Sequence, residues 1–311
     1  MESLPDGVRP VAEYHLAVGK PGEHHASGGG KATRAVLVLT CARLVGGHED
    51  AAVPGAVAVE LVHGFSLLHD DIMDRDRLRR HRPAAWVEFG VPAALLTGDA
   101  LLAQAVRVVE ATGSHRAVSV LVEALDGLMR GQSMDLAFER HADVTLGEYR
   151  SMAEGKTGAL LGAACGLGAV LGGAQEAAVS ALQRFGRCAG IGFQCVDDLL
   201  GLWGDPQRTG KPVGGDVTGG KKTYPLLAAL GAEGAAGDRV RHLYARPESW
   251  SPERVAELLR AIEDAGGRAA AEREAAAQVR QALHHLDEAS LPEPARRELA
   301  SLTHDMIHRL R

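Results

Sequence analysis

Apolar residues recur at steps of three and four along most of the chain, and no segment sustains an alternation of apolar and polar residues. Residues three and four apart lie on one face of an α-helix, so this periodicity predicts helices with one apolar face. Only 4% of the residues are aromatic, whereas Ala, Leu, Val and 38 glycines dominate. This mixture favours helices that pack closely through small side chains. We therefore predict an all-α fold.

The chain has 311 residues, of which 46% are hydrophobic, so it is long and apolar enough to bury a large core. Two glycine-rich stretches interrupt the helical pattern, GEHHASGGGK near the start and WGDPQRTGKPVGGDVTGGKK at residues 203–222. The second is predicted to be an irregular, mobile loop. Since no linker divides the chain, we predict one domain over residues 1–311, with a motif-bearing core at 28–225 and amphipathic helices at 233–311.

Charge and terminal composition exclude several classes of protein. A net charge of −6 and a pI near 6.2 leave no basic surplus for nucleic-acid phosphates, so we expect no nucleic-acid partner. The start MESLPDGVRP has no apolar stretch behind positive charge, which indicates no signal peptide and a cytoplasmic protein. No CxxC spacing occurs, and we expect buried thiols at Cys41, Cys165, Cys188 and Cys195.

One uncharged stretch, Thr157 to Gln175, approaches the length of a membrane span. It holds six glycines and few bulky apolar side chains, and the spacing of Gly158, Gly162 and Gly166 permits close approach of a neighbouring helix. We therefore predict a buried helix and no stable membrane insertion.

The segment LLHDDIMDRDRLRRHRP, residues 67–83, places three aspartates just before five arginines. Taken alone, such a run is typical of a solvated loop. However, the preceding helix carries Asp70, Asp71 and Asp74 onto one face of its last turns, at the helix end that disfavours negative charge. A cation should therefore hold them. Oxygen-only donors favour Mg²⁺, which completes its shell with water and substrate phosphate oxygens.

A second acidic pair, Asp197 and Asp198, ends another apolar helix in FQCVDDLLGLWGD. Alone it is more typical of a solvated pair or a cap. Metal sites in helical bundles use side chains from facing helices, so both acidic groups are predicted to share one cavity. Several basic residues could then grip phosphate oxygens: Lys31, Arg34, Arg79, Arg80, Lys156, Lys211 and Lys221.

Together these segments resemble the trans-isoprenyl diphosphate synthases, also called polyprenyl synthetases, in order from Gly29 to Pro225. The early segments GGKATR, ELVHGFSLLHDDIMD and LRRHRP are similar to the family's GKxxRP, ExxHxxSLxxDDxxD and RRGxP. LTGDALL, GQSMDL and KTG match GDxLL, GQxxDL and KTG, and residues 193–225 match FQxxDDxLDxxGDxxxxGKxxxxDxxxxKxT. The resemblance implies a single-domain bundle of about ten or more helices around a central cavity (isoprenoid synthase type).

The resemblance also implies a chain-elongating prenyltransferase that joins isopentenyl diphosphate to dimethylallyl, geranyl or farnesyl diphosphate. An allylic diphosphate ionises and the double bond of isopentenyl diphosphate attacks the cation, while the loop at 203–222 closes to exclude water. Three Mg²⁺ ions on the allylic diphosphate would be bound by Asp70, Asp71, Asp74 and Asp197, supported by Asp198 and Asp216. That diphosphate would contact Arg79, Lys156, Lys211 and Lys221. Isopentenyl diphosphate would be held by Lys31, Arg34, His63 and Arg80. Cavity and substrate contacts would come from Gln194 and Thr157. A homodimer is expected.

Two departures from the family pattern matter for the site. The second aspartate motif usually ends in a third aspartate, yet this chain has Gly201, and the proline after Arg34 is replaced by Ala35. Phe65, five positions before Asp70, resembles the archaeal-type geranylgeranyl synthases, in which an aromatic ring helps form the tunnel floor and Ser66 leaves space. We therefore expect a C20 product, with C15 farnesyl diphosphate as the alternative.

Three other functions stay open. A di-iron bundle needs two Glu-x-x-His motifs, and Glu60 with His63 supplies one. A terpene cyclase would explain Gly201, but it needs no isopentenyl site and usually shields its cation with aromatic rings. A catalytically silent partner subunit is the non-enzyme alternative. The intact aspartates of the first motif argue against it, whereas Gly201 is consistent with it.

Overall fold

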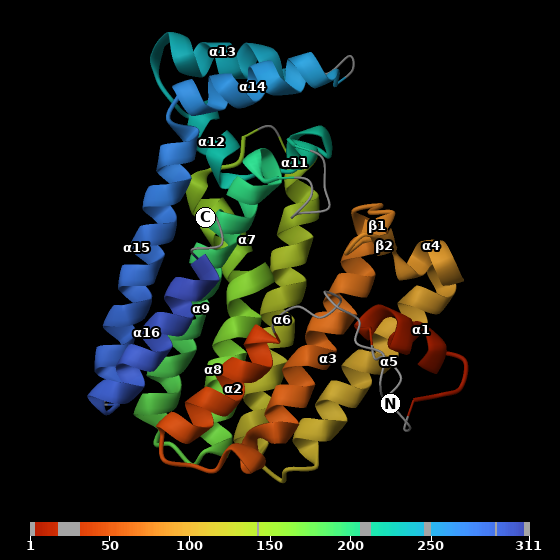
Figure 1. The fold of residues 1–311 in the computed structure, drawn as a ribbon, viewed down its shortest axis with the longest axis vertical. Helices are drawn as coiled ribbons and strands as arrows, with labels where there is room; N and C mark the ends of the chain where they lie inside the picture. The colour runs from red at the N-terminus through yellow and green to blue at the C-terminus, as the bar shows by residue number, and fades with distance from the viewer. Residues whose placement is uncertain are drawn as a thin grey trace. The chain divides into compact units, whose positions relative to one another are not determined.

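The computed structural model describes residues 4–17, 32–141, 143–205, 213–245, 250–289 and 291–307. Within these ranges the regular structure is helical, apart from one pair of two-residue antiparallel strands (Figure 1). Those strands are β1 (Leu78–Arg79) and β2 (Arg82–Pro83), with Leu78 opposite Pro83 and Arg79 opposite Arg82. The all-α prediction is confirmed.

The helices follow the predicted apolar segments closely. The first group consists of α1 (Arg9–Leu16), α2 (Thr33–Leu44), α3 (Glu49–Met73), α4 (Ala85–Phe89), α5 (Val91–Glu110) and α6 (His115–Phe138). The middle group consists of α7 (Leu146–Ala153), the π-helical turn η1 (Glu154–Gly158), α8 (Ala159–Leu171), α9 (Glu176–Trp203) and α11 (Gly215–Thr218). The last group consists of α12 (Tyr224–Leu230), α13 (Gly234–Tyr244), α14 (Pro252–Asp264), α15 (Gly267–Glu288) and α16 (Glu293–Ile307).

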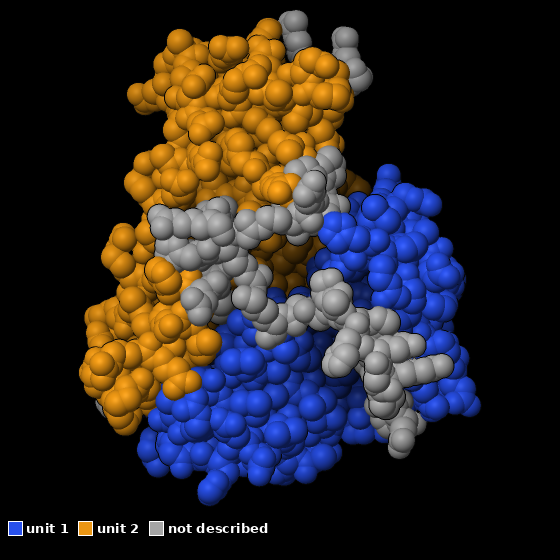
Figure 2. All heavy atoms as spheres, in the orientation of Figure 1, with its two compact units in different colours: residues 1–125, 163–183 blue, residues 126–162, 184–311 orange. Residues whose placement is uncertain are grey.

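The chain divides into two compact units, coloured separately in Figure 2. Unit 1 comprises Met1–Leu125 and Ala163–Gln183, and unit 2 comprises Asp126–Gly162 and Arg184–Arg311. The boundaries fall inside α6, α8 and α9. That the chain forms one domain stays a prediction.

Helix α3 is the central element of unit 1 and packs against both α2 and α5. Its buried face includes Val59, Val62 and Leu68, and Leu101 of α5 is fully buried as well. Burial of such a side chain stabilises the fold by about 1.5–3 kcal/mol. By length and composition α3 and α5 could each cross a membrane, but a core helix passes the same test, and more than half of the apolar window of α3 is buried in the protein.

The glycine-rich helix α8 is buried, as predicted. A Cβ atom on Gly158 would lie 2.9 Å from the carbonyl oxygen of Arg187, and one on Gly166 would lie 2.6 Å from Cγ of Gln183. Both neighbours belong to α9, so Gly158 of η1 and Gly166 of α8 permit α9 to approach closely. All four cysteines are buried free thiols, as expected.

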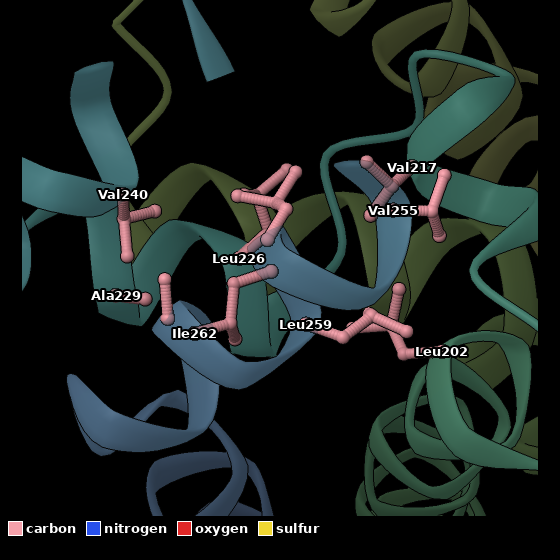
Figure 3. Packing of buried hydrophobic residues seen from close by; sticks show 10 residues of the cluster. Leu202, Val217, Leu226, Ala229, Val240, Val255, Leu259 and Ile262 are labelled. Carbon is pink, nitrogen blue, oxygen red and sulfur yellow. The ribbon is translucent and has the colours of Figure 1, made fainter. Parts of the chain in front are cut away.

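A hydrophobic cluster in unit 2 holds the segment that follows α9 (Figure 3). Leu202 at the end of α9 and Val217 of α11 are almost completely buried there, together with Leu226, Leu258 and Ile262. The cluster therefore anchors α11 and α12 next to the acidic end of α9.

Candidate active site

The first aspartates lie at the C-terminal end of α3 in unit 1. Asp74 is the C-cap residue, and its N–H donates to the carbonyl oxygen of Asp70 over 2.8 Å. Asp71 is only 1% exposed, and its carboxylate accepts hydrogen bonds from Nε of Arg79 at 2.9 and 3.2 Å and a further one from Nη2. Arg79 therefore neutralises the most buried carboxylate at the helix end that disfavours negative charge.

The β1–β2 hairpin directs Arg79 back toward α3. Its turn residues Arg80 and His81 have φ angles of 52° and 62°, in the left-handed region that non-glycine residues rarely adopt. His81 stands where the family segment RRGxP has glycine. The hairpin therefore accepts backbone strain while it carries two predicted diphosphate ligands, Arg79 and Arg80.

A cationic cluster surrounds His63 on α3. Burial lowers the pKa of His63 well below its usual value, and the charges of Arg34, Arg80, Arg79 and His15 lower it further. The structure thus brings three predicted isopentenyl diphosphate ligands, Arg34, His63 and Arg80, within electrostatic reach of one another. Lys31, the fourth, lies outside the described residues.

His15 of α1 is a member of this cluster that the sequence did not indicate. Burial, Arg79 and Arg80 lower its pKa to about 4, against the effect of a hydrogen bond with the backbone of Gly64. With His15 neutral, the guanidinium groups of Arg79 and Arg80 make this environment positive, which favours an anionic partner. No motif includes His15, so only tertiary structure could reveal it.

Glu60 has a structural role at the start of α2. Its Oε1 atom accepts a hydrogen bond from the backbone N–H of Ala35 over 3.1 Å. A proline at position 35 would have no such N–H, so the departure at Ala35 gains a bond that holds Arg34 beside α3. Within the described ranges no three His, Cys, Asp or Glu side chains form a metal site by themselves, and the di-iron alternative gains no support.

Phe65 is buried on α3, and its ring packs edge-on against His69 with ring centroids 4.8 Å apart. Nε2 of His69 lies 3.2 Å from the carbonyl oxygen of Leu95, and a Cβ on Gly98 would lie 2.3 Å from the same nitrogen. His69 therefore lies in a notch of α5 and supports Phe65. The Ser66 hydroxyl donates to the carbonyl oxygen of His63 over 2.9 Å.

In unit 2, Asp198 is the centre of a buried hydrogen-bond network. Its Oδ2 accepts from the Tyr149 hydroxyl at 2.6 Å and from the Tyr224 N–H at 2.8 Å, and its Oδ1 accepts from Nε2 of Gln194 at 3.0 Å. The Thr157 hydroxyl donates to Oε1 of Gln194 over 2.6 Å. The predicted residues Thr157, Gln194 and Asp198 are thus joined in one chain of contacts.

The two neighbouring aspartates of α9 have different environments. Asp198 is 5% exposed, and burial raises its pKa to about 7 against the hydrogen bonds it accepts, with a further rise from the charge of Asp216. Asp197 is exposed. The solvent-facing carboxylate is therefore Asp197, while Asp198 fixes Gln194 and two tyrosines. That the acidic ends of α3 and α9 share a cavity stays a prediction.

Lys156 lies in the π-helical turn η1, a feature that is frequent at functional sites. Its Nζ atom is 2.5 Å from Oδ2 of Asp135. Asp135 belongs to the GQSMDL segment, so this motif could have indicated that Asp135 takes part in the site. No sequence motif indicated Tyr149.

Lys211 lies outside the described residues, and Lys221 follows α11, where its N–H donates to the carbonyl oxygen of Asp216 over 2.9 Å.

Glu274 of α15 accepts hydrogen bonds that stabilise the network around Asp198. The fork of Arg150 donates to both of its oxygens at 2.8 Å, and the Tyr224 hydroxyl and the Gln278 amide donate to them at 3.0 and 2.9 Å. Hydrogen bonding to Arg150 is the largest cause that lowers the pKa of Glu274 to about 2. Because Tyr224 also binds Asp198, α15 contributes to the position of the site.

We expect Glu274→Gln to lower the free energy of unfolding by about 2 kcal/mol near neutral pH, because it removes charge-assisted bonds from a nearly buried group. The folded pKa is depressed from 4.5 to about 2, so the stabilisation is present above about pH 4.5 and is lost as the pH falls toward 2. Urea unfolding should therefore show a difference between variant and wild type that shrinks in acid. Glu257→Gln, in an exposed pair, is the control. A constant difference at every pH would contradict the assignment.

Comparison with known proteins identifies the family of the chain. The family model for polyprenyl synthetase matches residues 16–262. The chain belongs to the polyprenyl synthetase family. It is 41% identical to the (2E,6E)-farnesyl diphosphate synthase of Mycobacterium tuberculosis over 99% of this chain and 88% of that protein. It is also 41% identical to a geranylgeranyl diphosphate synthase of the same organism, over 93% and 84% of the two chains.

Solved structures show the same fold. A polyprenyl synthetase from Streptomyces coelicolor A3(2) superposes with a TM-score of 0.91 at 40% identity, over 98% of this chain and 94% of that chain. A polyprenyl synthase from Caulobacter crescentus CB15, complexed with calcium and isoprenyl diphosphate, gives 0.85 at 29% identity, over 96% and 87%. This polyprenyl synthetase is therefore a trans-prenyltransferase with the all-α isoprenoid synthase fold. Relatives at equal identity make different products, which leaves the product length open.

Proposed function

We propose that this enzyme is a Mg²⁺-dependent geranylgeranyl diphosphate synthase, which condenses isopentenyl diphosphate with an allylic diphosphate. The single observation that carries the C20 assignment is Phe65, buried five residues before Asp70 and held by His69. An aromatic ring there resembles the tunnel floor of archaeal-type geranylgeranyl synthases. The 41% identity to a geranylgeranyl diphosphate synthase supports the same product, and the equal identity to a farnesyl diphosphate synthase keeps C15 as the alternative.

The donor atoms fit Mg²⁺ delivered with a diphosphate. The end of α3 and the exposed Asp197 supply carboxylate oxygens, and Mg²⁺ usually takes one or two carboxylates and fills its shell with water and phosphate oxygens. The metal-bound relative from Caulobacter crescentus supports a divalent cation. Asp70, Asp71, Asp74 and Asp197 would hold the ions. Bound Mg²⁺ would supply Lewis-acid stabilisation of the negative charge on the leaving diphosphate.

The remaining residues bind, orient and exclude water. Arg79 is paired with Asp71 and can shift to diphosphate oxygens when Asp71 binds a cation, while Lys156, held by Asp135, can donate a further hydrogen bond to the same diphosphate. The cluster of Arg34, His63 and Arg80 would hold isopentenyl diphosphate near the carbon that ionises. Gln194, fixed by Thr157 and Asp198, presents a rigid polar group to the cationic intermediate. The proton lost from the new chain can pass to the departing diphosphate.

A second copy of the chain is the proposed partner. Val91, Leu95 and Leu96 of α5 are exposed, Leu96 to 61%, and Val122 and Met129 of α6 are about half exposed. Large exposed apolar side chains on long helices favour association. A homodimer through α5 and α6 would cover them.

Incubation with Mg²⁺, labelled isopentenyl diphosphate and each allylic starter tests the proposal. A C20 diphosphate is the expected product, and C15 would support the farnesyl alternative. A hydrocarbon formed from farnesyl or geranylgeranyl diphosphate without isopentenyl incorporation would show a cyclase. No turnover would favour a silent subunit.

Phe65→Ala is expected to move the product above C20, because removing the ring deepens the space below the growing chain. Chromatography of dephosphorylated products measures the chain length. Phe89→Ala, at an exposed ring on α4, is the matched control and should leave the product unchanged. An unchanged product from Phe65→Ala would show that this ring only packs the core.

A further inference from the structure

Lys222 is a buried lysine that directly follows Lys221, one of the predicted diphosphate ligands. Only 8% of Lys222 is exposed, although lysine is almost never fully buried unless its charge is paired. The family segment KxT, which matches residues 221–223, specifies no residue type at this position. Lys222 is therefore a buried charge for which neither the motif nor the chemistry described above accounts.

The ammonium group of Lys222 is bound by Tyr244, the last residue of α13. Its Nζ atom donates to the Tyr244 hydroxyl oxygen over 3.1 Å and lies 4.6 Å from the centre of the ring. The negative face of an aromatic ring attracts a cation, and the attraction is stronger where water is excluded. Within the described ranges Lys222 forms no ion pair with a carboxylate. The contact with Tyr244 therefore holds the charge in place.

Tyr244 is itself fixed by the packing of α13 and α14. It packs against the hydrophobic cluster of unit 2 together with Trp250, and the two ring centroids are 6.5 Å apart. The guanidinium group of Arg254 on α14 lies 5.8 Å from the centre of the Trp250 ring, and its Nη2 atom donates to the carbonyl oxygen of Leu243 over 3.0 Å. This helix pair therefore offers Lys222 a rigid partner.

The backbone around Lys222 is tied to the acidic end of α9. The N–H of Lys221 donates to the carbonyl oxygen of Asp216 over 2.9 Å, and the N–H of Tyr224 donates to Oδ2 of Asp198 over 2.8 Å. Lys222 lies between these two bonds and one peptide unit from Lys221. Its contact with Tyr244 therefore restricts the backbone from which the Lys221 side chain extends. Such restriction lowers the entropy that is lost when Lys221 binds a ligand.

We propose that Tyr244, acting through Lys222, is a positioning residue that holds Lys221 ready for the diphosphate of the allylic substrate. The helix pair α13–α14 then contributes to substrate binding although it carries no motif. The inference rests on the proposed function, because it takes Lys221 as a ligand of that diphosphate.

Titration calorimetry of the full chain with inorganic pyrophosphate and Mg²⁺ tests the proposal. Tyr244→Leu and Lys222→Met should each weaken binding by about tenfold, and the double variant should bind no more weakly than Lys222→Met, because both act through one contact. Tyr244→Phe, which keeps the ring, should lose about threefold. In steady-state kinetics KM should rise for the allylic diphosphate and stay unchanged for isopentenyl diphosphate. A general loss of stability would not separate the two substrates.

Arg239→Met is the matched control, because it removes a cation that links α13 to Glu257 of α14 and does not contact Lys222. Its pyrophosphate affinity should stay within about twofold of wild type. The Tm without ligand shows that each variant is folded, and Tyr244→Phe keeps the test valid where Tyr244→Leu unfolds.

Wild-type affinity in Lys222→Met, or additive losses in the double variant, would overturn the inference, and so would an equal loss in Arg239→Met. Absence of isopentenyl incorporation by wild type, with the expected binding pattern intact, would overturn the proposed function and leave the inference standing.

Discussion

Asp70→Asn is expected to lower kcat/KM for chain elongation by about a hundredfold to a thousandfold, a loss typical of removing one charge-stabilising group from a transition state. The substitution keeps the shape of the side chain and removes one negative charge from the acidic end of α3. The free energy of unfolding should change little, because a helix C-terminus disfavours negative charge by about 0.3–1 kcal/mol whereas the charge of Arg79 attracts Asp70.

Steady-state kinetics over a series of Mg²⁺ concentrations, together with urea unfolding, measure the two effects separately. Asp238→Asn, at an exposed site on α13, is the control and should change neither. A loss of activity with unchanged or increased stability is the signature of a residue kept for binding. Activity within tenfold of wild type at every Mg²⁺ concentration would remove Asp70 from the metal site.

Gly131→Ala is expected to lower both the stability and the activity strongly. A Cβ on Gly131 would lie 2.1 Å from the backbone nitrogen of Lys156 and 2.6 Å from the carbonyl carbon of Gly155. Both contacts are to backbone, so α6 and η1 must separate. Overpacking of this kind costs about 1–3 kcal/mol, and we expect a value near the upper end. Separation also moves Lys156 away from Asp135, so activity should fall together with stability.

The control is Gly147→Ala in α7, where the nearest heavy atom to the added Cβ is 3.8 Å away. Alanine is the better helix former, so this variant should be neutral or slightly stabilised. Thermal unfolding and single-turnover rates report the two effects. A Gly131→Ala protein with the wild-type Tm and rate would show that α6 and η1 are not in the close contact seen here.

The helices, the family and the chemical type of the ligands could be predicted from the sequence. The steps of three and four placed the apolar helices, because helix formation depends on local periodicity and on burial of one face. The glycine spacing in Thr157–Gln175 predicted a buried helix with a close neighbour, and the structure shows that this neighbour is α9. Short motifs indicated the family and the chemical type of each ligand, since a diphosphate demands carboxylates for its metal and cations for its oxygens.

Tertiary structure alone decided how those side chains are used. Asp197 and Asp198 are neighbouring residues of the same type. Asp197 is exposed, whereas Asp198 is buried against Tyr149 and Tyr224, because α7 and α12 pack on the side of α9 that carries Asp198. His15 joins the cationic cluster from a helix with no motif. The Asp216 carboxylate lies in the space that a side chain at Gly201 would occupy. Such contacts join residues far apart in the chain, so they depend on the packing of helices and not on any local pattern.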